Sequence, residues 1–382
     1  MNFTVSYLIV ITWAIFSCPN VFFMFAPYMT LKGSPPELTG ILVGAFYAAT
    51  TLIRPVGGWI VERVGIRRTL AVSSALCSVS ALFKFVTVSF LPLLVIRFAM
   101  GCFFGIFVVA LTTYQSLVIP EAVRGKAFAI ISIGSISCLF TVTPLAEWLL
   151  SQGMPELFLA MPVCTTAICV VLSLRLPPIN FENSKESGWG TRRELYDGTP
   201  FWRMVTSCML FAICDASIVY ISALTIAMGL APSCFMVANG LGAVTIRVLG
   251  KEFFNKHPRH VFAGPSLLLM AVFLYFTAMA PNNFWLFVFG FVNGVGVGYG
   301  YPAHLAMIGD LAPARLRAKA SSLVYFCNDV SWFILPVYVG FLTPYAGEVG
   351  AFKSLALFSA VSGVGVTLMW RRYLNSVSPQ EG

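Results

Sequence analysis

Charged side chains are scarce in this sequence. Asp, Glu, Lys and Arg together make up 10% of the 382 residues, whereas hydrophobic residues make up 58%. A soluble protein of this length could not cover its surface with so little charge. The scarcity therefore excludes a soluble globular protein and indicates an integral membrane protein. Long unbroken apolar runs, rather than alternating ones, favour transmembrane helices over a β-barrel.

Several chemical signatures are missing as well. The ten cysteines contain no CxxC pair, so neither disulfides nor a metal site is indicated. No GxxxxGK[ST] phosphate loop, metal-ligand cluster or nucleophile elbow occurs, which leaves no residue basis for an ATPase, a membrane enzyme or a bound cofactor. The first apolar span lacks a basic segment in front of it and is longer than a usual signal-peptide core, so we expect a retained helix.

Twelve apolar stretches are long enough to cross a membrane. They are predicted at residues 5–30, 37–61, 69–90, 92–113, 125–150, 157–176, 201–228, 233–254, 261–280, 283–308, 318–342 and 351–370. The longest polar segment, 177–200, lies halfway along the chain. We therefore predict an all-α integral membrane protein with an N-terminal six-helix bundle (1–176), a cytoplasmic linker (177–200) and a C-terminal six-helix bundle (201–382).

The lysines and arginines are distributed asymmetrically among the predicted loops. If the N-terminus is cytoplasmic, most of the 24 basic residues lie in inner loops or tails, and only Lys32 and Lys353 lie in outer loops. Four basic residues lie well inside spans, away from their ends: Arg54, Lys84, Arg97 and Arg247. Since positive residues stay preferentially on the cytoplasmic side, we predict a multi-pass protein of the inner (plasma) membrane with both termini cytoplasmic. Topology then accounts for the net charge of +9, and no nucleic-acid partner is indicated.

The two halves share a weak internal repeat. A shift of 193 positions superimposes Arg54 on Arg247, Gly57 on Gly250, Arg63 on Lys256, Pro120 on Pro313, Arg124 on Arg317 and Lys126 on Lys319. A shift of 189 superimposes Gly101 and Gly105 on Gly290 and Gly294. Because the matches recur at the same loops of each half, they indicate a duplicated six-helix unit. A parallel repeat of this kind predicts a shared site between the halves, near the bilayer midplane.

Three motifs resemble signatures of the major facilitator superfamily. The loop Gly58-x-x-x-Glu62-Arg63-x-Gly65-x-Arg67-Arg68 is similar to the superfamily's loop between helices two and three, with Glu62 where an aspartate is usual and Ile66 where a basic residue is common. Arg97-x-x-x-Gly101 resembles its signature in helix four, and Pro120-Glu121-x-x-Arg124-Gly125-Lys126-Ala127 resembles its turn into helix five. The resemblance covers the whole chain and implies a secondary transporter.

The lead-in Arg54-Pro55-x-x-Gly58 is similar to bacterial efflux-type members of the 12-helix group. That resemblance implies export in exchange for protons. Proton-coupled exporters of the family usually carry a glycine-rich Gly-Pro motif in helix five, whereas this sequence has Thr143-Pro144-Leu145-Ala146-Glu147. The departure weakens the antiporter assignment.

Two carboxylates and two arginines lie deep within predicted spans. Asp215 in helix seven and Asp329 in helix eleven are candidates for a proton or substrate-cation site, because an ionisable group inside a span is paired, faces water or acts on substrate. Arg54 and Arg247 would attract an anionic or zwitterionic solute, since a guanidinium offers a carboxylate two parallel hydrogen bonds. The alternative is that the acids and the arginines neutralise one another.

Four further residues are weaker candidates for solute binding or proton coupling. His304 in helix ten suits a proton relay because imidazole titrates near neutral pH, although a hydrogen-bonded buried imidazole is the alternative. Asn20 and Gln115 are neutral polar groups that would bond either solute or a neighbouring helix. For Arg97 the family resemblance implies a role in proton coupling, with a structural tie between helices as the alternative.

Lys84 and Glu147 are less promising, because we expect both side chains to snorkel to the membrane interface.

The loop formed by Gly58, Glu62, Arg63, Gly65, Arg67 and Arg68 also has a mechanical interpretation. Gly58 would allow close helix contact and Gly65 a tight turn. Glu62 would pair with a basic residue or with the N-terminus of helix eleven, closing the cytoplasmic side in the outward-open state. The alternative is that the arginines merely anchor the loop. We favour a gate, because anchoring needs neither Glu62 nor the two glycines.

The leading functional hypothesis is a monomeric secondary active transporter in the lipid bilayer. It would move a small organic solute by alternating access, as proton-coupled export. The second hypothesis is uptake or exchange of an anionic metabolite held by Arg54 and Arg247. The third is a non-transporting receptor or assembly factor on the same fold, which the short linker and the intact first loop do not favour.

Overall fold

The computed structural model describes the backbone of residues 3–119, 127, 130–177, 193–194, 196, 200–249, 258–312 and 317–377. Within these ranges every regular element is helical, as the prediction of an all-α protein requires. The chain divides into a first compact unit, Met1–Asn183 with Pro336–Phe341, and a second, Ser184–Leu335 with Leu342–Gly382. Three predicted features lie outside the described residues: the turn at 120–126, most of the linker and the second-half loop at 250–257.

The described residues of the first half of the chain form seven α-helices. They are α1 (Phe3–Val21), α2 (Phe25–Leu31), α3 (Pro36–Val64), α4 (Ile66–Leu82), α5 (Phe90–Val118), α7 (Ile133–Ser151) and α8 (Pro155–Leu174). Within this unit α3 packs on α5, α4 packs on α5 and α8, and α1 packs on α7 and α8. Proline opens α3 and α8, at positions where a helix has no internal partner for the backbone N–H.

In the part of the second half that the structure describes there are six α-helices. They are α10 (Phe201–Asp215), α11 (Ile221–Ala227), α12 (Pro232–Leu249), α14 (Ala263–Thr277), α15 (Asn283–Leu311) and α16 (Arg317–Val377). Here α12 packs on α15, and α14 packs on both α10 and α15.

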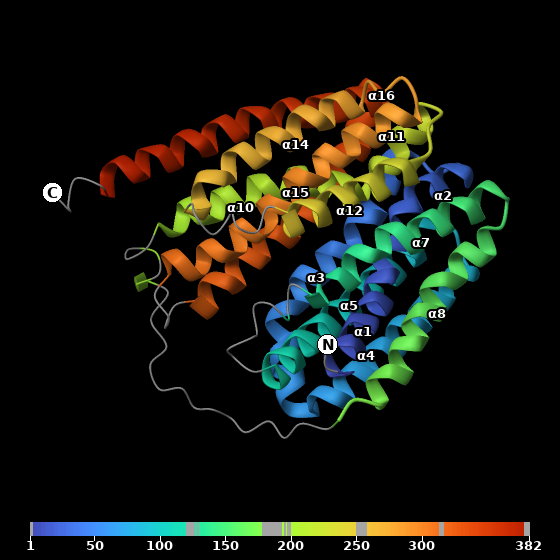
Figure 1. Cartoon of the computed structure of the whole chain (residues 1–382). Helices are drawn as coiled ribbons and strands as arrows, with labels where there is room; N and C mark the ends of the chain where they lie inside the picture. The colour runs from blue at the N-terminus through green and yellow to red at the C-terminus, as the bar shows by residue number, and fades with distance from the viewer. Residues whose placement is uncertain are drawn as a thin grey trace. The chain divides into compact units, whose positions relative to one another are not determined.

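The last helix corrects a predicted boundary. A loop was expected at 343–350 between two spans, but α16 runs on both sides of a single non-helical residue, Gly347. Gly347 has φ 66° and ψ 170°, a conformation open to glycine and costly for residues with a Cβ. The chain turns back at this point, so that the second arm of α16 lies along α14 (Figure 1).

Eleven helical stretches in the described part of the chain are long and apolar enough to span a membrane. The last of them, Tyr325–Asn375, covers two of the predicted spans, which form the two helical arms of α16 on either side of the turn at Gly347. Lengths and positions of the other ten agree with the predicted spans to within several residues. The apolar runs therefore identify the membrane-crossing helices correctly.

Two matching helix pairs have the closest approaches. In the first unit, a Cβ added to Gly101 of α5 would meet the backbone of Phe46 in α3. In the second unit, a Cβ added to Gly290 of α15 would meet the backbone of Phe235 in α12, 3.1 Å from its Cα. The glycines that the 189-residue shift superimposes thus have the same packing role in each unit, where only a hydrogen side chain lets the backbones touch.

The opening helix of each unit is interrupted in the same way. α1 continues into α2 through a 3-10 turn at Phe22–Met24, and α10 continues into α11 through another at Ala216–Val219. A 3-10 turn tightens the backbone and changes which carbonyls remain free. The predicted continuous spans 5–30 and 201–228 missed both interruptions, because the sequence stays apolar across them.

Candidate functional site

Asp215 occupies the interruption in the second unit. It is the last residue of α10, directly before the 3-10 turn, and its side chain is half-buried. The carboxylate therefore lies next to a short 3-10 segment whose four residues are all buried. Asn20 has the related position in the first unit, two residues before the turn at Phe22–Met24, and its amide nitrogen donates to Phe16 O at 2.8 Å.

Arg247 faces Asp215 from the neighbouring part of the second unit. The two side chains interact electrostatically, and the guanidinium Nε of Arg247 donates to Gly298 O at 3.1 Å. This bond ties α12 to α15 and fixes one edge of the guanidinium. The electrostatic interaction is consistent with the predicted neutralisation of an arginine by a membrane-embedded acid, and the pairing of Arg247 with Asp215 stays a prediction.

Tyr301 extends this group of polar residues. It follows Gly298 by one turn of α15 and interacts electrostatically with both Asp215 and Asp329. Asp329 is buried on α16. The four side chains of Asp215, Arg247, Tyr301 and Asp329 form what we term the acidic cluster of the second unit. Sequence reasoning missed Tyr301 because an uncharged tyrosine is not conspicuous in an apolar helix. The available clue was that Tyr301 lies one helical turn after Gly298.

His304 lies one turn further along α15. Its Nδ1 is 2.8 Å from Gly300 O, and its Nε2 is 2.8 Å from Ser207 Oγ. A carbonyl can only accept, so Nδ1 carries the proton, and Nε2 accepts from the Ser207 hydroxyl in the neutral ring. The imidazole also packs on Phe211, with ring centroids 4.7 Å apart. The structure thus gives His304 the environment of a hydrogen-bonded buried imidazole.

Arg97 ties two helices of the first unit together. Its side chain is buried, with Nε donating to Leu42 O at 3.0 Å and Nη2 to Val43 O at 3.3 Å. Both acceptors belong to α3, and the guanidinium also lies 4.6 Å from the centroid of the Phe22 ring. These contacts match the structural alternative considered for this residue.

Lys84 differs from the expectation that it snorkels to the interface. Its side chain is 2% exposed, and its Nζ lies 3.2 Å from the centroid of the Phe22 ring. Within the described residues Nζ has no hydrogen-bond partner, and Arg97 is close enough to interact with it electrostatically. Lys84 belongs to the short 3-10 segment Phe83–Phe85 that follows α4, and this segment directs its side chain inward.

The other predicted residues of the first unit are placed as follows. Gln115 is buried on α5, and Arg54 is half-buried on α3, immediately before a proline inside the helix. The proposed pairing of Arg54 with Asp215 or Asp329 would join the two units, whose relative placement is not determined, and it stays a prediction.

The loop between α3 and α4 contains one confirmed and one corrected feature. Gly65 alone separates the two helices, with φ +85° and ψ 144°, which confirms the tight turn. Gly58 does not provide close contact inside its unit, because an added Cβ would meet no atom within 4 Å. The close approach belongs to Gly57, where a Cβ would lie 3.3 Å from Val109 Cγ2. The face of α3 that packs against α5 therefore contains Gly57, the residue before Gly58.

The arginines of this loop have separate partners. Arg67 donates from Nη2 to Leu174 O at the end of α8, which satisfies a carbonyl that the helix leaves free. Arg63 is exposed and lies 4.2 Å from the centroid of the Trp59 ring, and Arg68 is exposed. The Glu62 side chain lies outside the described residues.

These features allow a comparison with known proteins. A family model for the Major Facilitator Superfamily matches residues 7–251 and 221–381, which together cover nearly the whole chain. The chain belongs to the Major Facilitator Superfamily.

Solved transporters share this fold along almost their full length. A POT family transporter in complex with a thioalcohol conjugated peptide aligns with a TM-score of 0.80 at 12% identity, over 97% of this chain and 96% of that chain. A D-xylose-proton symporter aligns with a TM-score of 0.76 at 13% identity, over 96% of this chain and 97% of that one. At such identities the likeness concerns the superfamily fold alone.

One curated relative is similar in sequence. The niacin transporter NiaP of Acinetobacter baylyi is 29% identical over 111 residues, which are 29% of this chain and 24% of that protein. The matched stretch spans about a quarter of the relative.

Proposed function

We propose that this superfamily member couples the movement of a small organic solute to protons, with Asp215 as the proton-carrying group. The observation that carries the proposal is the electrostatic interaction of Asp215 with Arg247 beside the 3-10 turn that follows α10. A carboxylate held in an apolar span is costly unless it is paired or protonated. The positive charge of Arg247 offsets the cost of holding this carboxylate in an apolar span.

Protonation of Asp215 would release Arg247. The attraction between the two side chains exists only while the carboxylate is charged, so a proton on Asp215 leaves the free edge of the guanidinium available to an anionic or polar solute. Because Arg247 remains bonded to Gly298, it keeps its position when the acid is neutralised. Proton binding and solute binding are then linked through one arginine, and the linkage is reciprocal.

We propose export as the direction, on the resemblance of the Arg54-Pro55-x-x-Gly58 lead-in to efflux-type transporters. The basic loops favour an orientation with both termini in the cytoplasm. Direction can be measured in everted membrane vesicles: an exporter accumulates solute when the interior is acidified, whereas a symporter releases it.

Uptake or exchange of an anionic metabolite is the second candidate, and the similarity to a niacin transporter favours it. Niacin is a pyridine carboxylic acid, so its anion fits a guanidinium that a protonated acid has released. Nicotinate and nicotinamide are a matched pair of probes, because they share the ring and differ in charge. Under this candidate Arg247→Gln weakens nicotinate binding at least tenfold more than nicotinamide binding, and equal losses would count against it.

Proton coupling is tested by Asp215→Asn in proteoliposomes that contain the purified full chain. The solute is first chosen by thermal shift from a panel that includes nicotinate and nicotinamide, at several pH values. The variant should lose accumulation driven by a pH gradient and keep exchange of labelled for unlabelled solute. Asp310→Asn is the matched control, because Asp310 is an exposed acid of the same unit that pairs with Arg259 at 2.6 Å. Unchanged gradient-driven accumulation in Asp215→Asn would refute the assignment.

A further inference from the structure

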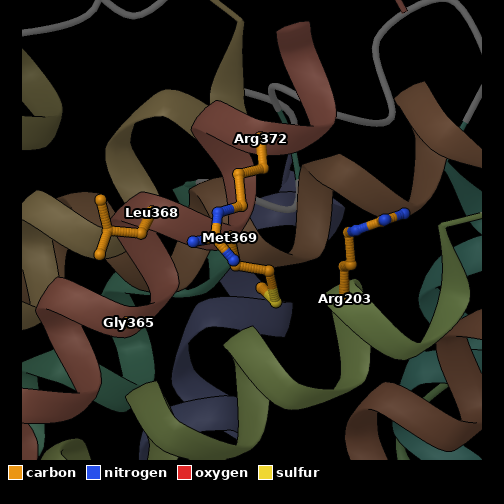
Figure 2. A pocket seen from close by; sticks show the side chains of 5 residues that line it. All are labelled: Arg203, Gly365, Leu368, Met369 and Arg372. Atoms are coloured by element: carbon orange, nitrogen blue, oxygen red, sulfur yellow. The ribbon is translucent and has the colours of Figure 1, made fainter. Parts of the chain in front are cut away.

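The second unit contains a pocket outside the acidic cluster, with a volume of about 400 Å³. Five residues line it: Arg203, Gly365, Leu368, Met369 and Arg372. Arg203 comes from the first turn of α10, and the other four come from the last turns of α16 (Figure 2). The pocket therefore lies between helices that are more than a hundred residues apart in the sequence, at one end of the unit.

The lining combines two guanidiniums with an apolar wall. Leu368 and Gly365 are exposed on a helix that is apolar enough to span the membrane, so this wall faces lipid. Figure 2 shows the Arg372 guanidinium beside the Met369 side chain, whereas the Arg203 side chain, on the other helix, extends away from Arg372. The Arg203 guanidinium lies 5.1 Å from the centroid of the Tyr373 ring. Among the described residues, no carboxylate is recorded as a partner of either arginine.

The depth of the pocket follows from neighbouring residues. The start of α10 and the end of α16 are the ends that the distribution of lysine and arginine assigns to the cytoplasmic surface. Trp202, next to Arg203, is 63% exposed and stacks on Tyr196 with ring centroids 5.6 Å apart. Exposed Trp and Tyr side chains are typical of the boundary between lipid headgroups and acyl chains. Headgroups are therefore expected at the level of the two arginines.

We propose that this pocket binds the phosphate of an anionic phospholipid, with the acyl chain along Leu368 and Gly365. Guanidiniums bind phosphate oxygens through parallel charge-assisted hydrogen bonds, and either arginine of this lining can supply such bonds to a phosphodiester while the other adds positive charge at the same level. A soluble phosphate compound would use the arginines but gain nothing from the apolar wall. Basic pockets between helices on the cytoplasmic side are suited to anionic headgroups. The proposal is independent of the transported solute.

The test measures the thermal stability of the purified full chain in detergent micelles doped with phosphatidylglycerol or phosphatidylcholine. Phosphatidylglycerol should raise the apparent Tm, and phosphatidylcholine should not. Arg203→Gln and Arg372→Gln should each raise the half-saturating phosphatidylglycerol concentration about fivefold, the usual contribution of one basic residue near an anionic surface. Arg371→Gln is the matched control, since Arg371 is exposed beside Arg372 and does not line the pocket.

A second variant tests the shape of the pocket without changing its charge. A Cβ added to Gly365 would meet no atom within 4 Å, so Gly365→Leu is accommodated by the fold and extends into the pocket. It should also raise the half-saturating phosphatidylglycerol concentration at least fivefold. An equal effect of Arg371→Gln and Arg372→Gln, or no effect of Gly365→Leu, would overturn the proposal in favour of unspecific surface attraction. Stabilisation by glycerol 3-phosphate or inorganic phosphate alone would overturn the lipid assignment in favour of a soluble phosphate compound.

Discussion

Gly298 is the residue on which the position of Arg247 most directly depends. Its carbonyl accepts the hydrogen bond from Arg247 Nε, and its Cα lies against the backbone of α12. A Cβ added at this position would lie 2.5 Å from Ala243 Cα and 2.7 Å from Ile246 Cγ2. Since non-bonded carbons prefer about 3.5–4.0 Å, Gly298→Ala must separate α12 from α15 by about 1 Å.

The expected loss of stability follows from this displacement. Overpacking of a well-packed contact costs about 1–3 kcal/mol. Separation by about 1 Å also stretches the bond from Arg247 Nε to Gly298 O, now 3.1 Å, beyond hydrogen-bonding distance. An interhelical hydrogen bond in a membrane protein contributes about 0.6–1.7 kcal/mol. Gly298→Ala should therefore destabilise the second unit by about 2–5 kcal/mol.

The measurement is thermal unfolding of the purified protein in lipid-free detergent. Gly298→Ala should lower the apparent Tm by several degrees, whereas Gly365→Ala, whose Cβ meets open space, should leave the Tm equal or slightly higher because alanine favours a helix. Ala243→Gly in the Gly298→Ala background should give no rescue, since the clash is with the Ala243 backbone and not with its side chain. A neutral Gly298→Ala, or a rescue by Ala243→Gly, would refute the packing argument.

Two further predictions concern the first unit. Lys84→Met should raise the apparent Tm. It removes a buried ammonium that has no hydrogen-bond partner among the described residues, which saves several kcal/mol of desolvation, and it loses only about 2 kcal/mol of cation–π attraction to Phe22. A lower Tm would show that the ammonium is stabilising. Gly65→Ala should destabilise by about 1–3 kcal/mol, because φ +85° and ψ 144° suit only glycine, whereas Gly58→Ala should be neutral or slightly stabilising. Thermal melts of the two glycine variants side by side check this, and equal effects would contradict it.

The acidic cluster shows how far sequence reasoning reaches into the site. Asp215, Asp329 and Arg247 were identifiable because a charge within an apolar span is conspicuous. Tyr301 was not identifiable, since an uncharged aromatic residue is common in such spans. The interaction of Asp215 with Arg247 was one of several pairings that the sequence left open, because helix order along the chain does not state which side chains face each other.

Lys84 and Gly58 illustrate the opposite limit. Lys84 was expected to snorkel because of its position in a predicted span, and Gly58 was expected to allow close helix contact because it belongs to a motif. The inward direction of Lys84 depends on a 3-10 turn of three residues, and the contact at Gly57 instead of Gly58 depends on a rotation of α3 by one residue. Such rotations change the face of a helix by about 100° per residue, while hydropathy along the chain is unaffected.

The sequence by itself determined the all-helical architecture, the apolar stretches long enough to span a membrane and the superfamily to which the chain belongs. These follow from one-dimensional properties, namely the length of apolar runs, the distribution of basic residues and recurring spacings. The tertiary structure decided the 3-10 interruptions beside Asn20 and Asp215, the turn at Gly347, the partners of Arg97 and His304, and the pocket between Arg203 and Arg372. These depend on which faces of helices meet, and the free-energy differences involved come from packing and hydrogen bonds between residues far apart in the chain.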